Sequence, residues 1–142
     1  MAVGRLIGLD IGDVRIGVAV SDPLGIVATP KAVITRTSDA ADAEAVAEAV
    51  REANAVTIVA GLPLNQHGEV GPQAEKALAF IEMLKETIEI PIETIDERFT
   101  TAIAHHALAQ GNVKSKKRKG KVDQVAAQQI LQTFLDRRGR TA

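Results

Sequence analysis

The amino-acid sequence predicts an α/β domain built on a five-stranded mixed sheet with helices on its faces. Short apolar runs of strand length open the chain, and later runs alternate with longer segments whose apolar residues recur at helical spacing. The first two runs are joined by only a short Gly-Asp connection, which is typical of an antiparallel hairpin. Each of the last two runs follows a helical segment, and a strand reached through a helix normally runs parallel to its neighbour.

Five segments are predicted to be strands because they are short, apolar and bounded by turn residues. The first contains a single acid in an otherwise apolar run. The central one reads Val-Thr-Ile-Val-Ala-Gly and carries no charge, as expected of a strand that is covered on both faces. The predicted strands are residues 6–11, 15–20, 31–35, 56–61 and 91–95.

Four segments have helical patterns. Ser38 is a good N-cap for the first of them, in which Ala43, Val46 and Val50 repeat at the spacing of one helix face. The lysine-rich stretch 111–121 is expected to be a flexible loop that leads into the last helix. The predicted helices are residues 39–53, 71–88, 100–109 and 122–136, and the whole chain, 1–142, is expected to form one domain.

The composition excludes several classes of protein. The chain has no Cys, which removes disulfides, thiolate metal sites and cysteine nucleophiles. It has no run of about 18 apolar residues that could span a membrane, and its first residues lack the pattern of a secretory leader. We therefore expect a cytoplasmic protein with no membrane partner. Three Phe are the only aromatic residues, so base stacking is a poor candidate for the mode of nucleic-acid binding.

A net charge of −1 conceals two oppositely charged parts of the chain. Residues 37–97 carry 13 acids and 3 bases, whereas residues 98–142 carry 10 bases and 2 acids. Six of the eight residues in 114–121 are Lys or Arg. We interpret this segment as an arm that neutralises phosphates, and the alternative is a solvated loop without a partner. The candidate phosphate-binding residues within it are Lys116, Lys117, Arg118 and Lys119.

Three acids stand where their placement needs an explanation. Asp10 lies inside an apolar strand, Glu97 follows the last predicted strand, and Asp123 opens the last predicted helix beside its apolar face. A buried carboxylate must be paired, hydrogen-bonded or bound to a metal, because its desolvation is expensive. Oxygen-only ligands favour hard cations such as Mg²⁺ or Mn²⁺, and such a set could hold two ions that act on a phosphodiester. The three acids are therefore candidate metal ligands and catalytic residues.

Each acid also has a structural interpretation. Asp123 could be no more than the N-cap of its helix. Asp10 could pair with Arg15 or Arg98, and Glu97 could pair with Arg98, which would leave Asp96 as the ligand. The two arginines flank the acids, so they are candidates for contacts to phosphates, and structural ion pairs explain them equally well.

An ordered set of motifs extends over nearly the whole chain. The motifs are Gly-Leu-Asp-Ile-Gly at 8–12, Arg-Ile-Gly-Val-Ala-Val-Ser-Asp at 15–22, Gly-Leu-Pro-Leu at 61–64, Asp-Glu-Arg at 96–98 with Thr-Thr at 100–101, the lysine-rich loop, and Val-Asp at 122–123 with Ala-Ala at 126–127 and Ile-Leu at 130–131. Any one motif is weak, whereas their order is specific, and in this order they resemble the YqgF family.

The resemblance implies a ribonuclease H-like fold, whose order of elements is the one predicted above. It also implies a metal-dependent endonuclease of the cytoplasm that matures the 5′ end of 16S rRNA, and it assigns the catalytic acids to Asp10, Glu97 and Asp123. In better-studied junction resolvases the second acid follows the central strand, where this chain has Gly-Leu-Pro at 61–63. Glu97 would therefore have to reach the site from the next strand.

The function predicted from the sequence is metal-dependent hydrolysis of phosphodiesters in structured nucleic acid, with pre-16S rRNA as the first choice of substrate. One alternative is a Holliday junction resolvase that acts on branched DNA, and another is a non-catalytic RNA-binding factor in ribosome assembly. A nucleotide-binding relative of actin and the sugar kinases is disfavoured, because that class needs two such domains. Monomer and homodimer are both compatible with the sequence.

Overall fold

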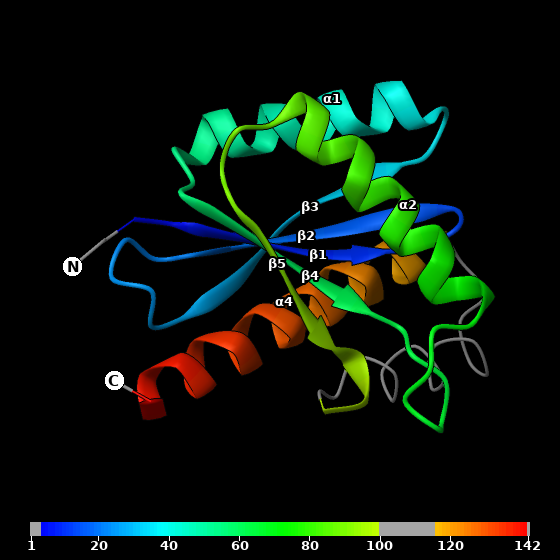
Figure 1. Cartoon of the computed structure of the whole chain (residues 1–142). Coiled ribbons are helices and arrows are strands. Elements are labelled where there is room, and N and C mark those ends of the chain that lie inside the picture. The colour runs from blue at the N-terminus through cyan, green and yellow to red at the C-terminus, as the bar shows by residue number, and fades with distance from the viewer. Residues whose placement is uncertain (1–3, 100–115, 142) are drawn as a thin grey trace.

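The computed structural model describes residues 4–99 and 116–141. In these ranges the strands form one sheet in the order β3-β2-β1-β4-β5 (Figure 1). The first three strands pair antiparallel as a meander, while β4 pairs parallel with β1 and β5 pairs parallel with β4. The predicted five-stranded mixed sheet is therefore confirmed. The strands are β1 (Leu6–Ile11), β2 (Arg15–Ser21), β3 (Ala28–Thr35), β4 (Thr57–Leu62) and β5 (Ile92–Asp96).

Helices cover both faces of this sheet. Helices α1 (Asp39–Ala53) and α2 (Pro72–Thr87) lie on one face, and the long helix α4 (Lys116–Thr141) crosses the other (Figure 1). A single 3-10 turn, η1 (Glu97–Phe99), follows β5 directly. No helix within the described ranges is both long and apolar enough to cross a membrane.

The side chains of β1 alternate between two apolar cores, as the period of two in a strand requires. Ile7 and Leu9 belong to the core beneath α1 and α2, and Leu6 belongs to the core beneath α4. Asp10 has the same parity as Leu6, so the strand directs its carboxylate to the face that α4 covers. The fold thus places this acid next to the last helix of the chain.

Strand β3 is longer than the sequence predicts. It begins at Ala28 rather than at Lys31, and Ser21 pairs with Ala28 at its start. The added residues include Pro30, which lacks a backbone N–H for the ladder. On β3 this loss is tolerated, because β3 is an edge strand of the sheet.

The last helix begins earlier than predicted, which corrects the assignment of the basic loop. Helix α4 already includes Lys116, so residues 116–121 are helical, and the helix extends past residue 136 to Thr141. Lys and Arg are good helix formers, and the glycine within 116–121, Gly120, costs only about 1 kcal/mol relative to Ala. The predicted helix 100–109 and the loop residues 111–115 lie outside the described residues.

Glycines on the inner strands let α4 approach the sheet closely. A Cβ atom on Gly17 would overlap the backbone carbonyl of Asp123, and a Cβ on Gly8 would lie 2.7 Å from Cβ of Leu131. Real Cβ atoms essentially never come this close to another heavy atom. The seat of α4 on β1 and β2 therefore depends on the absence of side chains at these positions.

We expect Gly17→Ala to lower the free energy of unfolding by about 1–3 kcal/mol, because the new methyl group meets backbone that cannot rotate away. Urea denaturation at neutral pH measures the change. Gly71→Ala is the control, since a Cβ there meets nothing within 4 Å, and it should cost less than about 1 kcal/mol. Equal losses in the two variants would contradict the close packing of α4.

Candidate active site

Asp10 stands near the end of β1, between two glycines on the neighbouring strands. Gly17 of β2 is its direct partner in the antiparallel pair. On the other side, Leu9 pairs with Ala60 of β4, so Gly61 comes next to Asp10. The Asp10 side chain is buried, with only 5% of its surface exposed. This central carboxylate therefore has space on both sides, over the two glycines.

Glu97 fills the space over Gly61. A Cβ on Gly61 would lie 2.6 Å from Oε1 and 2.8 Å from Cγ of Glu97, so no larger residue fits there without moving this side chain. Glu97 is buried and starts the 3-10 turn after β5. The expectation that this acid reaches across from the next strand is thus confirmed in its geometry. Its catalytic role stays a prediction.

Asp123 lies over Gly17 on the opposite side. Its backbone carbonyl packs against Gly17, and its buried carboxylate accepts a hydrogen bond from Nε of Arg15 at 2.7 Å. Because α4 begins at Lys116, Asp123 lies inside the helix, and the N-cap interpretation is wrong. The prediction that Asp123 opens the helix is wrong for the same reason, whereas its predicted direction towards the body of the protein is confirmed.

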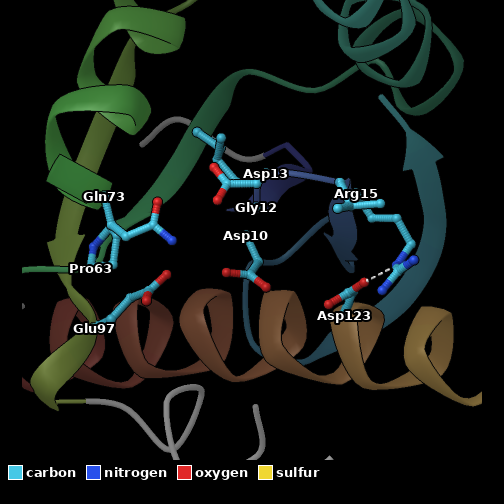
Figure 2. A pocket seen from close by; sticks show the side chains of 10 residues that line it. Asp10, Gly12, Asp13, Arg15, Pro63, Gln73, Glu97 and Asp123 are labelled. Atoms are coloured by element: carbon cyan, nitrogen blue, oxygen red, sulfur yellow. Dashed lines mark hydrogen bonds and ion pairs between the residues drawn. The ribbon is translucent and has the colours of Figure 1, made fainter. Parts of the chain in front are cut away.

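The three acids line one pocket, with Asp10 between Glu97 and Asp123 (Figure 2). The pocket has a volume of about 410 Å³. We call it the acid pocket, because four carboxylates and one guanidinium give its lining a formal charge of −3. Its lining residues are Asp10, Ile11, Gly12, Asp13, Val14, Arg15, Pro63, Gln73, Glu97 and Asp123.

Asp96 belongs to an ion pair and does not line the acid pocket. Its carboxylate accepts hydrogen bonds from the backbone N–H of Arg98 at 2.9 Å and from Nη2 of the same residue at 2.7 Å. The Arg98 guanidinium holds the pKa of Asp96 below its ordinary value of 3.8, and the pKa of Arg98 is raised in turn. Of the two neighbouring acids, Glu97 is thus the one that faces the pocket.

The predicted phosphate-binding residues are only partly brought to the pocket. Arg15 lines it and pairs with Asp123, so the structural interpretation of Arg15 also holds. Arg98 pairs with Asp96, outside the pocket lining. The backbone of Lys116–Lys119 forms the start of α4, the helix that carries Asp123, while their side chains lie outside the described residues.

Two polar lining residues, Asp13 and Gln73, were not assigned to the site from the sequence. Asp13 was treated only as part of a tight turn, although a turn that follows Asp10 by three residues ends at the same edge of the sheet. Gln73 stands in the first turn of α2, and no local pattern marks it. The position of α2 relative to the sheet, which sequence periodicity does not give, brings Gln73 to the pocket.

The donor chemistry of the acid pocket fits a hard divalent cation. The charged groups of its lining that can bind a metal ion are all carboxylates, whose oxygens Mg²⁺ and Mn²⁺ prefer as ligands. No three acidic, His or Cys side chains in the described ranges come together closely enough to cage one ion. Mg²⁺ does not need such a cage, since it is commonly held by one or two carboxylates together with water and substrate phosphates. Asp10, placed between two other acids, fits that mode.

Solved structures share this architecture. The Thermus thermophilus RuvC structure in complex with Holliday junction substrate superposes with a TM-score of 0.60 and covers 98% of both chains at 13% identity. The fowlpox virus Holliday junction resolvase gives a TM-score of 0.53, covering 94% of this chain and 99% of that chain at 13% identity. The sheet order and the helix on each face place the protein in the ribonuclease H-like fold.

Comparison at the level of sequence is more specific. The family model described as "RuvX: Holliday junction resolvase" matches residues 4–137. A Clostridium botulinum protein is 46% identical over 93% of this chain and 96% of its own length, and a Desulforamulus reducens protein is 47% identical over the same shares. Both are named "Putative pre-16S rRNA nuclease". The chain belongs to the RuvX (YqgF) family and is a nuclease.

The Asp96–Arg98 pair predicts a pH dependence of stability. Because folding lowers the pKa of Asp96, the carboxylate stabilises the fold above pH 3.8, and this contribution is lost as the pH falls below that value. Asp96→Asn should therefore lower the free energy of unfolding by less than about 1 kcal/mol at pH 7, since the pair is partly exposed. Urea denaturation between pH 7 and pH 3 measures the difference from wild type. A difference that disappears already between pH 7 and pH 5 would contradict this assignment.

Proposed function

We propose that this protein is an endonuclease that hydrolyses phosphodiesters of structured nucleic acid with Mg²⁺ or Mn²⁺, and that its substrate is the 5′ region of precursor 16S rRNA. The choice of RNA rests on the names of the relatives that are 46–47% identical. A protein that matures ribosomal RNA works where ribosomes assemble, so we also propose a cytoplasmic location. Branched DNA is the second candidate, because the matching family model is described as a Holliday junction resolvase.

One observation carries the proposal: three buried carboxylates from distant parts of the chain meet in one pocket. Asp10 comes from β1, Glu97 from the turn after β5, and Asp123 from α4. Burial of like charges side by side is unfavourable for folding unless cations compensate them. Acids that converge on one pocket from three separate elements are more readily explained by catalysis than by structure.

The proposed reaction replaces one P–O bond with another. The oxygen of a water molecule bonds to phosphorus, the bond to the sugar oxygen breaks, and that oxygen leaves with a proton as a hydroxyl group. Asp10, Glu97 and Asp123 would hold the divalent cations and orient the scissile phosphate in the acid pocket. When bound, such cations make water a stronger nucleophile and stabilise the charge that develops on the leaving oxygen.

Positive side chains would bring the polyanionic substrate to a pocket whose lining is negative. Arg15 stands at the pocket and offers a guanidinium beside Asp123. We propose that Arg15 contacts the phosphate next to the scissile one. Arg98 would contact a more distant phosphate of the nucleic-acid strand. Lys116, Lys117, Arg118 and Lys119 lie in the helix that delivers Asp123, and we assign them to phosphates as well.

Cleavage should depend on a divalent cation and on Asp10. We expect the wild type to cut a labelled pre-16S rRNA leader in Mg²⁺ or Mn²⁺ and to stop when a chelator is added. Asp10→Asn should lower the rate by at least about 100-fold, since loss of a metal ligand exceeds the effect of losing its supporting partners. Gel analysis of the labelled products measures the rates, with a four-way DNA junction as the second substrate.

The outcomes separate the candidate functions. Cutting of the junction but not of the leader would replace RNA by DNA as the substrate. Tight binding of the leader without cutting in either cation would favour the non-catalytic assembly factor. A folded Asp10→Asn variant that cuts at the wild-type rate would overturn the assignment of the acids.

Two neighbouring acids provide a matched comparison. Glu97→Gln should lower the cleavage rate by at least about tenfold, because it removes a carboxylate that lines the acid pocket. Asp96→Asn removes a partly exposed ion pair and should change the rate by less than about threefold. Both rates are measured at saturating Mg²⁺ on protein shown to be folded by circular dichroism. The reverse order of the two effects would make Asp96 the ligand.

A further inference from the structure

Arg36 connects the turn of the first hairpin to both helices on the far face of the sheet. It follows β3 and precedes the N-cap of α1. Its backbone N–H donates to the carbonyl of Val14 at 2.9 Å, and its side chain is largely buried, with 16% exposed. A long charged side chain in such a place needs partners for its guanidinium.

The guanidinium of Arg36 has partners from three elements. Nε donates to the Asp42 carboxylate and Nη2 donates to Asp39, each at 2.9 Å, so two bonds go to α1. Nη1 donates to the backbone carbonyl of Gly12 at 2.9 Å. The group also lies 4.9 Å from the centre of the Phe80 ring of α2.

The hydrogen bond from Arg36 to Gly12 connects Arg36, which does not line the acid pocket, to a residue that does. The N–H of Gly12 donates to the carbonyl of Arg15 at 3.0 Å, which closes the turn between β1 and β2. Asp10 precedes this turn, Asp13 is part of it, and Arg15 follows it. All three residues line the acid pocket. A shift of the turn would therefore move a ligand acid and a phosphate contact together.

Asp42 keeps the Arg36 guanidinium in place. Its side chain is among the most buried in the structure, and it also accepts a hydrogen bond from the backbone N–H of Thr37 at 3.1 Å. The planar guanidinium can donate along several directions at once, whereas a Lys ammonium is a single point on a flexible stem. Lys at this position could pair with Asp42 but could not also reach Gly12 in the same geometry.

We propose that Arg36 is a positioning residue for phosphodiester hydrolysis: it fixes the β1–β2 turn through Gly12, so that Asp10, Asp13 and Arg15 keep the arrangement the reaction needs. This inference rests on the proposed function. Arg36 touches no substrate, and Arg15 is the one proposed phosphate contact on the turn, so the loss of Arg36 acts more on the rate of the chemical step than on the affinity for nucleic acid. Small displacements of reacting groups are costly, with losses of order 10²-fold for about 1 Å.

The test uses Arg36→Lys, which keeps the charge and the pair with Asp42. We expect kcat to fall by at least about tenfold and the Kd for the uncut RNA leader to change by less than about threefold, because the proposed phosphate contacts outside the turn stay in place. Hydrogen exchange at the backbone amide of Gly12, which donates to the carbonyl of Arg15 and closes the turn, should become faster, as followed by mass spectrometry of the hairpin peptide.

Two control variants separate positioning from general stability. Asp39→Asn removes only an exposed partner of Arg36 and should leave kcat unchanged. Val46→Ala removes buried methyl groups of α1, so it should lower Tm at least as much as Arg36→Lys while kcat measured well below Tm stays at the wild-type level.

The proposal is overturned if folded Arg36→Lys keeps the wild-type kcat, if Val46→Ala loses as much activity, or if the loss lies only in Kd. The exchange measurement keeps the test independent of the nuclease assay. If the wild type cuts no substrate, the proposed function fails, and unchanged exchange in the turn of Arg36→Lys would still refute the positioning role by itself.

Discussion

The candidate site depends on the absence of side chains at two glycines, which lie on the strands either side of Asp10. Gly17 on one neighbouring strand admits the backbone of α4 with Asp123, and Gly61 on the other admits the side chain of Glu97. Neither acid could come next to Asp10 if its glycine carried a side chain. The two positions without a Cβ atom therefore determine where the two outer carboxylates lie. Because Asp123 belongs to α4, the packing of this helix on the sheet also sets the geometry of the pocket.

The same arrangement concentrates negative charge at the site. Carboxylates that face one pocket repel each other, and Arg15 offsets this in part through its pair with Asp123. The turn that carries Arg15 is in turn fixed through Gly12 by Arg36 and the buried Asp42. Charge on the far face of the sheet thus supports charge at the site.

Much of this could be predicted from the sequence, because periodicity and burial are local properties. Apolar spacing predicted the order of the elements along the chain, including the helix at 39–53. It also predicted that Asp10 and Asp123 point inward. The start of α4 was missed because a run of like charges reads as a loop, although Lys and Arg are good helix formers. Gln73 was missed because its role depends on how α2 lies against the sheet, which is a tertiary property.

The order of the elements along the chain has a consequence for when the pocket exists. It joins β1, the first element, to α4, the last element of the described chain, and Arg15 and Asp123 are 108 positions apart. Contacts between such distant segments form late in folding, because a large loop must close first. A nascent chain whose sheet has formed still lacks Asp123, so the acid pocket would be complete only after α4 has been synthesised and has docked.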